Sequence, residues 1–163
     1  MRGDPYLAGD NRPATSWDDV LRRIDYAKTF WLATAHDGAP HVMPLLAVSF
    51  DGRALFCAGP DTRKARNLAR DPRCVLATGA EGMDIVIEGA AVRVTDAATA
   101  ERAARVYLAK YGWDPEPRDG RFWAEGAPTA GAPPLDLYEV RPTKVFSFGT
   151  NESHNATRWT MAR

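Results

Sequence analysis

The sequence predicts a single, mainly β domain in which an antiparallel barrel of about six strands carries two or three helices. Short strand-like runs are separated by turn signals such as Asp37-Gly38 and Asp51-Gly52, which are typical of hairpins. Strands and helices do not alternate regularly, so a parallel doubly wound sheet is not expected. The length of 163 residues favours one domain. A closed antiparallel barrel suits the number and spacing of the strands.

The N-terminal segment 1–15 is polar and holds two prolines, so we predict a flexible arm ahead of one domain over 16–163. Ser16 and Asp19 resemble a capping box, and apolar residues at helical spacing follow them. A helix over about 17–28 is therefore expected.

The remaining elements follow from apolar runs and from residues that break them. The predicted strands are residues 30–35, 41–50, 54–58, 73–78, 84–95 and 135–148. Pro44 marks an edge or bulged strand, and Gly89 marks a bulge. Two further helices are predicted, at 63–70 before Asp71-Pro72 and at 97–111 after a capping Asp96. Residues 112–134 are predicted as a long irregular crossing, and 149–163 as a polar tail.

Composition excludes several function classes. Lysine plus arginine equals aspartate plus glutamate at 21 each, which argues against nucleic acid or a membrane surface as partner. No signal peptide and no apolar run of the roughly 20 residues needed to cross a bilayer is visible, so a cytoplasmic protein is expected. Cys57 and Cys74 form no CxxC pair and are interpreted as reduced, buried thiols.

The segment Asp61-Thr62-Arg63-Lys64 carries the clearest chemical signal. It follows a strand and a Gly-Pro break, and Thr62 or Asp61 can cap the helix that comes next. A helix N-terminus has unpaired N–H groups and a partial positive charge, so cations in the first turn are unfavourable unless an anion lies among them. A bound phosphate satisfies this condition. The simpler interpretation is that Arg63 and Lys64 lie on a solvated helix face.

The same segment resembles a known family. Asp61 to Pro72 is similar to the (S/T)-R-K-A-x-x-(hydrophobic)-x-x-(N/D)-P motif of the pyridoxamine 5′-phosphate oxidase-like proteins. Gly38 to Leu45 resembles their G-x-P-x-x-x-P strand, and Ala156 to Trp159 resembles the T-R-W ending of small actinobacterial members. The resemblance runs in consistent order from about residue 17 to 159. It implies a six-stranded antiparallel split β-barrel of Greek-key type, which binds FMN or the deazaflavin F420 between two subunits of a homodimer.

The resemblance also implies the cofactor-binding positions. Arg63 and Lys64, with Thr62 beside them, would bind the cofactor phosphate. Asp84 would reach the flavin of the other subunit. The remaining positions would lie along the ring and the ribityl chain: His41, Val42, Met43, Pro44, Leu45, Cys57, Ala58, Arg158 and Trp159.

The family's B6 oxidases end in R-x-H and carry a tract ending in S-Q-I-G-A-W, and both are missing here. We therefore do not expect oxidation of vitamin B6 phosphate. The second strand also begins with His41 where the family has Arg. The resemblance implies hydride transfer between FMN or F420 and a small organic molecule; the alternative is a non-catalytic cofactor carrier or sensor on the same fold. No catalytic residue is identified.

The histidines do not indicate a metal site. His36 and His41 flank one turn, and His154 lies near the C-terminus. A metal site needs at least three convergent ligands, so turn or surface positions are the simpler interpretation, and no metal is predicted.

Overall fold

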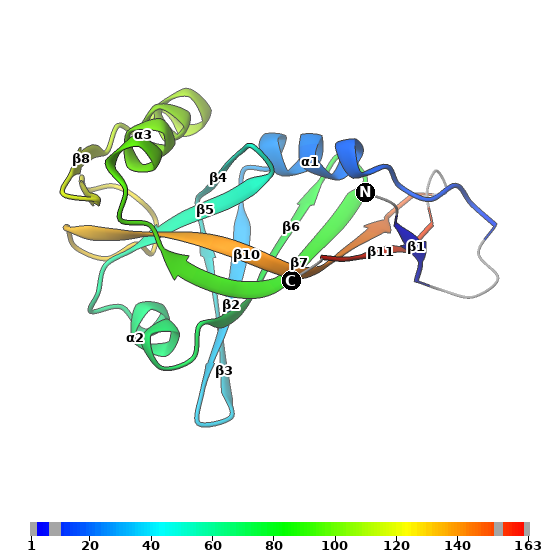
Figure 1. The fold of residues 1–163 in the computed structure, drawn as a ribbon, viewed down its shortest axis with the longest axis horizontal. Coiled ribbons are helices and arrows are strands. Elements are labelled where there is room, and N and C mark those ends of the chain that lie inside the picture. The colour runs from blue at the N-terminus through cyan, green and yellow to red at the C-terminus, as the bar shows by residue number, and fades with distance from the viewer. Residues whose placement is uncertain (1–2, 7–10, 152–154, 162–163) are drawn as a thin grey trace.

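A curved antiparallel sheet carries three helices in the computed structural model, which describes residues 3–6, 11–151 and 155–161 (Figure 1). The helices are α1 (Trp17–Tyr26), α2 (Arg63–Arg70) and α3 (Ala97–Tyr111). The strands are β1 (Asp4–Pro5), β2 (Phe30–His36), β3 (Ala39–Leu45), β4 (Ala47–Phe50), β5 (Arg53–Ala58), β6 (Arg73–Ala80), β7 (Met83–Arg93), β8 (Glu116–Arg118), β9 (Arg121–Trp123), β10 (Leu135–Gly149) and β11 (Thr157–Thr160). The predicted mainly β class with flanking helices is confirmed.

Each helix begins next to the residue whose side chain caps it. The Ser16 hydroxyl accepts a hydrogen bond from the Asp19 amide at 3.1 Å, and the Asp96 carboxylate accepts from the Thr99 amide at 2.8 Å. Thr62 caps α2 in the same way. These contacts satisfy amides that have no partner inside the helix. Helix α1 ends at Tyr26, two residues earlier than predicted.

The long strand β10 organises the sheet. It pairs with β9 and β7 along one edge and with β5 and β11 along the other. The main order is β1-β11-β10-β7-β6-β2-β3, so β3 with Pro44 lies at the end of this order, as predicted. The bulge is on β10 between Pro142 and Lys144, and not on β7 at Gly89. A Cβ atom at Gly89 would lie 2.2 Å from the Arg141 carbonyl oxygen, so the close approach of the two strands requires glycine.

Several predicted segments are divided differently in the structure. The predicted strand 41–50 is two strands, because β3 pairs with β2 and the chain then changes partner at Leu46, so that β4 pairs with β5. The predicted crossing 112–134 contains the β8–β9 hairpin, and the predicted polar tail contains β11. In the predicted arm, Asp4 and Pro5 pair with β11. These short strands raise the number above the six predicted.

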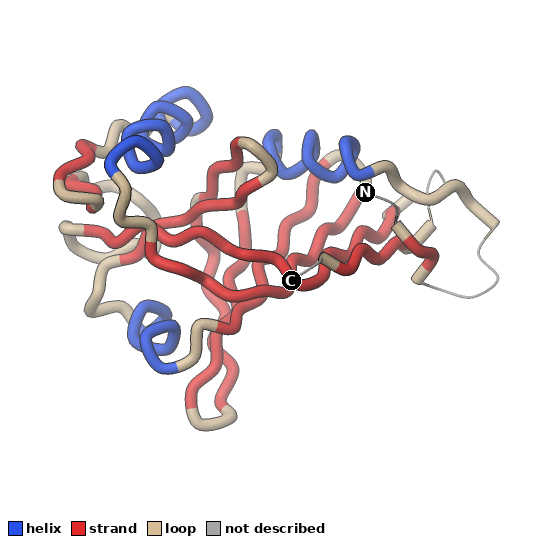
Figure 2. The backbone as a smooth tube through the Cα atoms, in the orientation of Figure 1, coloured by secondary structure: helices blue, strands red, loops and turns tan. Residues whose placement is uncertain are grey.

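Two apolar cores hold the molecule together. The barrel core lies between the inner sheet face, α1 and α2, and contains Phe30, Leu32, Phe56 and Ile85. A second core under α3 contains Tyr107, Phe122 and Leu137. Figure 2 shows α1 and α3 above the sheet in this view and α2 below it, beside the β2–β3 hairpin. Within the described residues, no helix is long and apolar enough to span a membrane.

Candidate functional site

Helix α2 begins where β5 ends, and its N-terminus is well defined. The Thr62 hydroxyl accepts a hydrogen bond from the Ala65 amide at 3.3 Å and donates one to the Gly59 carbonyl at 2.8 Å. The eight-residue helix contains four cationic side chains and no carboxylate. Its first turn therefore combines unpaired amides with positive charge, as the sequence predicted for an anion site.

Lys64 is the unusual residue of this turn. Its side chain is only 2% exposed, and its ammonium donates to the Thr129 carbonyl. Burial lowers the Lys64 pKa, and nearby Cys57 partly opposes this effect. Burial raises the pKa of Cys57 to about 12, so this thiol is neutral and does not balance the ammonium. Among the ion pairs of the described residues, none involves Arg63 or Lys64.

The Thr129 carbonyl belongs to a segment that crosses this end of the barrel, residues 126–132, which we call the strap. The Gly59 amide donates to the Ala130 carbonyl at 2.6 Å, and the Thr129 hydroxyl donates to the Pro44 carbonyl. A Cβ atom at Gly131 would lie 2.7 Å from the Thr62 methyl group. The strap thus contacts β3, the end of β5 and the start of α2 together.

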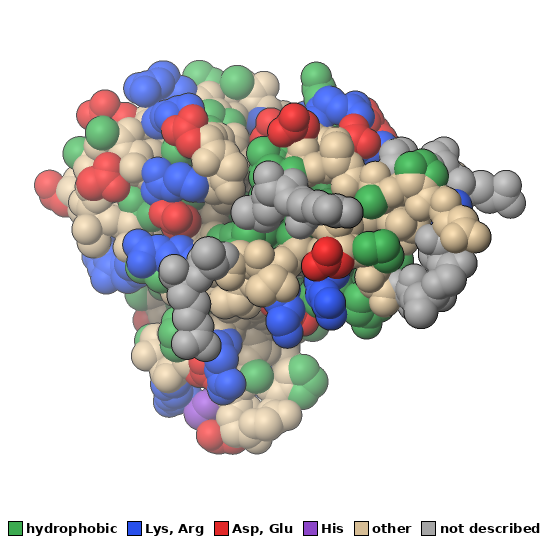
Figure 3. All heavy atoms as spheres, turned by 45° about the vertical axis from the view of Figure 1, so that its right-hand side comes forward, with side chains coloured by type: hydrophobic (Ala, Val, Ile, Leu, Met, Phe, Trp, Pro, Cys, Tyr) green, Lys and Arg blue, Asp and Glu red, His purple; other side chains and the backbone are tan. Residues whose placement is uncertain are grey.

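His41 of β3 adds an imidazole to the surroundings of these cations. Its pKa is lowered by burial and then by the charges of Arg63 and Lys64. The Asn67 amide group donates to the Thr34 hydroxyl at 3.0 Å, which fixes α2 against β2. Near the other end of α2, Arg70 contacts His36 at 2.7 Å. On the lower lobe in Figure 3, Lys and Arg side chains gather beside a histidine.

The structure brings together most of the predicted cofactor positions. The strap joins the start of α2 to β3, because Thr129 bonds to both Lys64 and the Pro44 carbonyl. The charges of Arg63 and Lys64 also lower the pKa of His41 on β3. Cys57 and Ala58 form the end of β5 beneath the strap and are buried. On the rest of β3, Leu45 is buried, Met43 is half-buried, and Val42 is exposed. We call Thr62, Arg63, Lys64 and His41 the cradle.

Three predicted positions lie elsewhere in the same chain. Asp84 is exposed at the start of β7, opposite Gly79, and most of β6 separates it from α2, a span of about 20 Å. Arg158 is exposed on β11. Trp159 is 1% exposed and packs against Trp17 at a ring distance of 5.5 Å. Within one chain, Trp159 is therefore a core residue, because alternation along β11 turns it inward.

Sequence reasoning missed the strap. Thr129 reaches Lys64 through a backbone carbonyl, and no side-chain pattern shows such a contact. The one available signal is the density of glycine and proline in 112–134, which indicated only an irregular crossing.

In the described residues, no group of three or more His, Cys, Asp or Glu side chains is arranged to hold a metal; His154 lies outside them.

The outer face of the sheet is apolar where antiparallel sheets facing water usually carry polar residues. Cross-strand pairing places Trp31, Val42, Pro44, Ala77 and Val86 on this face, which we call the apolar sheet face. Trp31 is 50% exposed and Val42 is 53% exposed. A hollow of about 480 Å³ lies beside them, lined mainly by small apolar residues of β2, β6 and β7.

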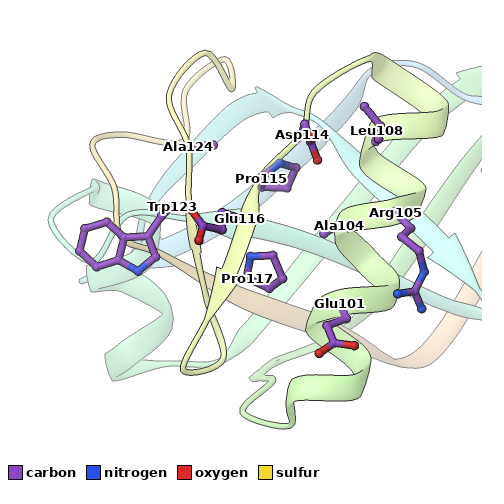
Figure 4. Close-up of a pocket in the computed structure, with 10 residues that line it drawn as sticks. All are labelled: Glu101, Ala104, Arg105, Leu108, Asp114, Pro115, Glu116, Pro117, Trp123 and Ala124. Atoms are coloured by element: carbon purple, nitrogen blue, oxygen red, sulfur yellow. The ribbon is translucent and has the colours of Figure 1, made fainter.

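A separate hollow of about 720 Å³ lies between α3 and the β8–β9 hairpin (Figure 4). Leu108 and Trp123 line it together with side chains of both charges, among them Glu101 and Arg105. The Glu116 carboxylate there is already paired with Arg118. Since its charges are mixed, this hollow has no convergent set of ligands comparable to the cradle.

Comparison with known proteins identifies the family. A model of the pyridoxamine 5′-phosphate oxidase family matches residues 17–149. The chain belongs to this family. The predicted family is thus confirmed. Among curated proteins, no sequence matches the chain.

Solved structures share the fold of this pyridoxamine 5′-phosphate oxidase family member at low identity. A putative pyridoxamine 5′-phosphate oxidase from Listeria innocua is 15% identical, with a TM-score of 0.61, over 82% of this chain and 98% of that one. A FAD-binding protein from Mesorhizobium loti is 19% identical, with a TM-score of 0.62, over 88% of this chain and 94% of that one. A heme binding protein from Mycobacterium smegmatis is 19% identical, with a TM-score of 0.64, over 90% of this chain and 58% of that one.

Proposed function

We propose that this protein binds a flavin-type cofactor, FMN or F420, with the cofactor phosphate at the cradle. The observation that supports this most directly is Lys64, a buried ammonium with one neutral carbonyl as its hydrogen-bond partner. A buried charge is costly unless a counter-charge lies beside it. A phosphate would supply that charge and would also accept from the α2 amides and from Arg63.

The residues present fit a phosphate group. Lys64 has two ammonium protons beyond the one given to Thr129, and Arg63 is exposed at the same helix end. The lowered pKa of His41 keeps its imidazole neutral near pH 7, so it can accept or donate a hydrogen bond without adding charge. Residues 41–45 of β3 would lie along the ring, whose chemistry is hydride transfer at N5 of a flavin or C5 of a deazaflavin.

We also propose that two copies associate through the apolar sheet face. A face with half-exposed Trp31 and Val42 favours burial against another surface. Such a dimer would let Asp84 and Arg158 approach the cradle of the other copy, since both are exposed and distant from the cradle of their own chain. Family membership and the FAD-binding neighbour support a flavin over an unrelated phosphate ligand.

The reaction we propose is hydride transfer between the bound cofactor and a small organic molecule. The alternative is a carrier or sensor that binds the same cofactor without turnover. It is favoured by the composition of the cradle, whose four side chains are a guanidinium, an ammonium, a hydroxyl and a neutral imidazole, and so include no carboxylate base.

Titration of the purified protein with FMN and with F420, followed by fluorescence, tests the proposal. We expect binding of one of them at micromolar or lower dissociation constant, weakened in Arg63→Ala but not in Arg66→Ala, an exposed cation further along α2. Absence of binding of both cofactors would refute the proposed function. Oxidation of the reduced cofactor by a panel of small unsaturated molecules then distinguishes an enzyme from a carrier.

A further inference from the structure

Two arginines from distant parts of the chain converge on one buried carboxylate. Arg93 of β7 and Arg121 of β9 each contact the same Oδ1 atom of Asp136 at 2.8 Å. The Asp136 side chain is 6% exposed, whereas those of Arg93 and Arg121 are 47% and 38% exposed. The buried aspartate therefore holds two guanidinium groups together, and each group keeps further N–H donors toward solvent.

The charges in this cluster do not balance. Two cations share one carboxylate, which leaves a surplus positive charge at one point. The α1 helix offers a contrast, because Arg22 and Arg23 share Asp19 there, but Glu81 also contacts Arg22. Two guanidinium groups held at one oxygen repel each other, and this repulsion favours the binding of a further anion between or beside them.

Tyr138 adds a donor to the same cluster. Tyr138 lies directly opposite Arg93 and two residues from Asp136 on β10, so alternation places its side chain on the same sheet face as theirs. Its pKa is raised by burial and by Asp136 and is lowered by Arg93 and Arg121. The Tyr138 ring stacks on Phe56 at 5.3 Å, which fixes its position. No hydrogen bond of the Tyr138 hydroxyl occurs within the described part of the chain.

The cluster lies at the end of the barrel that α2 closes. Arg93 pairs with Tyr138, and Asp136 pairs with Ala58, so alternation turns these side chains to the inner face of the sheet. The same face packs against Ala65 and Leu68 of α2. Gly59, Pro60 and Asp61 are the residues between Ala58 and the Thr62 cap.

We propose that Arg93, Arg121 and the Tyr138 hydroxyl form a second oxyanion site beside the cradle, which takes a carboxylate or phosphate group. Guanidinium groups in pairs suit the planar geometry of such anions. The identity of the ligand rests on the proposed function. The anion is either a second anionic group of the cofactor, as in F420 with its carboxylate tail, or the anionic group of a separate substrate.

The test uses a neutral variant that keeps polar side chains at all three positions, Arg93→Gln with Arg121→Gln and Asp136→Asn. Changing Asp136 as well avoids leaving a buried carboxylate without partners, so the variant is expected to fold. Arg118→Gln with Glu116→Gln is the matched control, because it neutralises an exposed ion pair on the neighbouring strand β8. Circular dichroism establishes folding of both variants.

Dissociation constants of FMN, F420 and inorganic phosphate are then compared by calorimetry. If the site takes a cofactor group, the neutral variant loses at least about tenfold in F420 affinity and less than about twofold in FMN affinity. If it takes a substrate group, both cofactor affinities are kept, and binding of phosphate to the FMN-loaded protein falls at least about tenfold. The control variant should show neither loss.

Unchanged affinity of the neutral variant for all three probes would overturn the second oxyanion site. Failure of the proposed function gives a different result, because the wild-type protein would then bind neither FMN nor F420. In that case, phosphate binding is compared with and without Arg93 and Arg121 in the Lys64→Met background, which lacks the buried one of the two cradle cations. A loss of phosphate affinity in this background supports the site, and no loss refutes it.

Discussion

Lys64, which is buried, and Lys110, which is half-buried, lie on opposite sides of the barrel and differ in their surroundings. The Lys110 ammonium donates to the Ile24 carbonyl at 3.2 Å and to the Ala47 carbonyl at 3.1 Å, and it lies over the rings of Phe30 and Tyr111. The Asp25 charge also acts on it. Lys64 has the Thr129 carbonyl and the neutral Cys57 thiol.

The difference indicates different roles for the two residues. Lys110 is held by several groups of its own chain, and its role is to join α3 to α1 and β4. Lys64 is more deeply buried but lacks a counter-charge, although its helix positions it firmly. A buried charge that the fold leaves uncompensated indicates a place for an anion. The following experiments compare these two regions.

The largest expected effect is the loss of cofactor affinity in Lys64→Met, a change that keeps side-chain length. Removal of a charged hydrogen bond to phosphate should cost about 2–3 kcal/mol, or roughly 30–150-fold in dissociation constant. Lys110→Met is the matched control and should leave the affinity within about threefold. Equal losses in both variants, measured by fluorescence titration, would remove the distinction between the two lysines.

The pH dependence of the free energy of unfolding should show the effect of the lowered Lys110 pKa directly. Burial lowers its pKa to about 8, Asp25 opposes this, and Lys28 adds to it. Because the folded-state pKa is below the unfolded value near 10.4, the unfolded chain binds more protons between these values, and stability rises with pH there. Allowing for solvent screening, we expect a rise of about 1–2 kcal/mol from pH 8 to 10.4.

Urea denaturation of the wild type and of Lys110→Met at several pH values measures this rise. The variant should have a flatter curve over the same range. The pKa of Lys64 is lowered as well, so its contribution has the same sign. Bound cofactor should cancel the Lys64 contribution and leave that of Lys110. A curve of Lys110→Met as steep as that of the wild type would contradict the account of Lys110.

The helix caps offer a third comparison. Thr62→Ala and Asp96→Ala each remove a side chain that caps a helix, and each should cost about 1 kcal/mol of stability. Only Thr62→Ala should also weaken cofactor binding, because Thr62 lies in the cradle. Thermal unfolding and cofactor titration of both variants, with Thr62→Ser as control, measure the two effects. Loss of cofactor affinity in Asp96→Ala as well would show a general effect of destabilisation.

The smallest effect is expected in the strap. Thr129→Val removes the hydroxyl that donates to the Pro44 carbonyl, while the residue keeps its positive φ of 58°. We expect a loss of about 0.5–1 kcal/mol of stability and faster proteolytic cleavage of the strap in the cofactor-free protein. Bound cofactor should slow this cleavage if the strap covers the ligand. Identical cleavage rates with and without cofactor would argue against that role.

Local signals in the sequence predicted the helix starts and the location of the cradle. Ser16, Thr62 and Asp96 are capping residues that act within a few positions of the chain, so their effect can be read locally. Long-range pairing could not be read in the same way. The division of 41–50 at Leu46 depends on which strand each half meets, and the burial of Trp159 depends on β11 joining β10. The bond between Lys64 and Thr129 joins residues 65 positions apart through a backbone atom.

The central claim is that Lys64 is present for the phosphate of the cofactor. FMN and riboflavin share the same ring and differ in the phosphate, so their dissociation constants should be measured for the wild type and for Lys64→Met. We expect the wild type to bind FMN at least about 30-fold more tightly than riboflavin, and Lys64→Met to lose most of this difference while its riboflavin affinity stays the same. A wild type that binds both equally, or a Lys64→Met variant that keeps the full preference for FMN, would contradict the account.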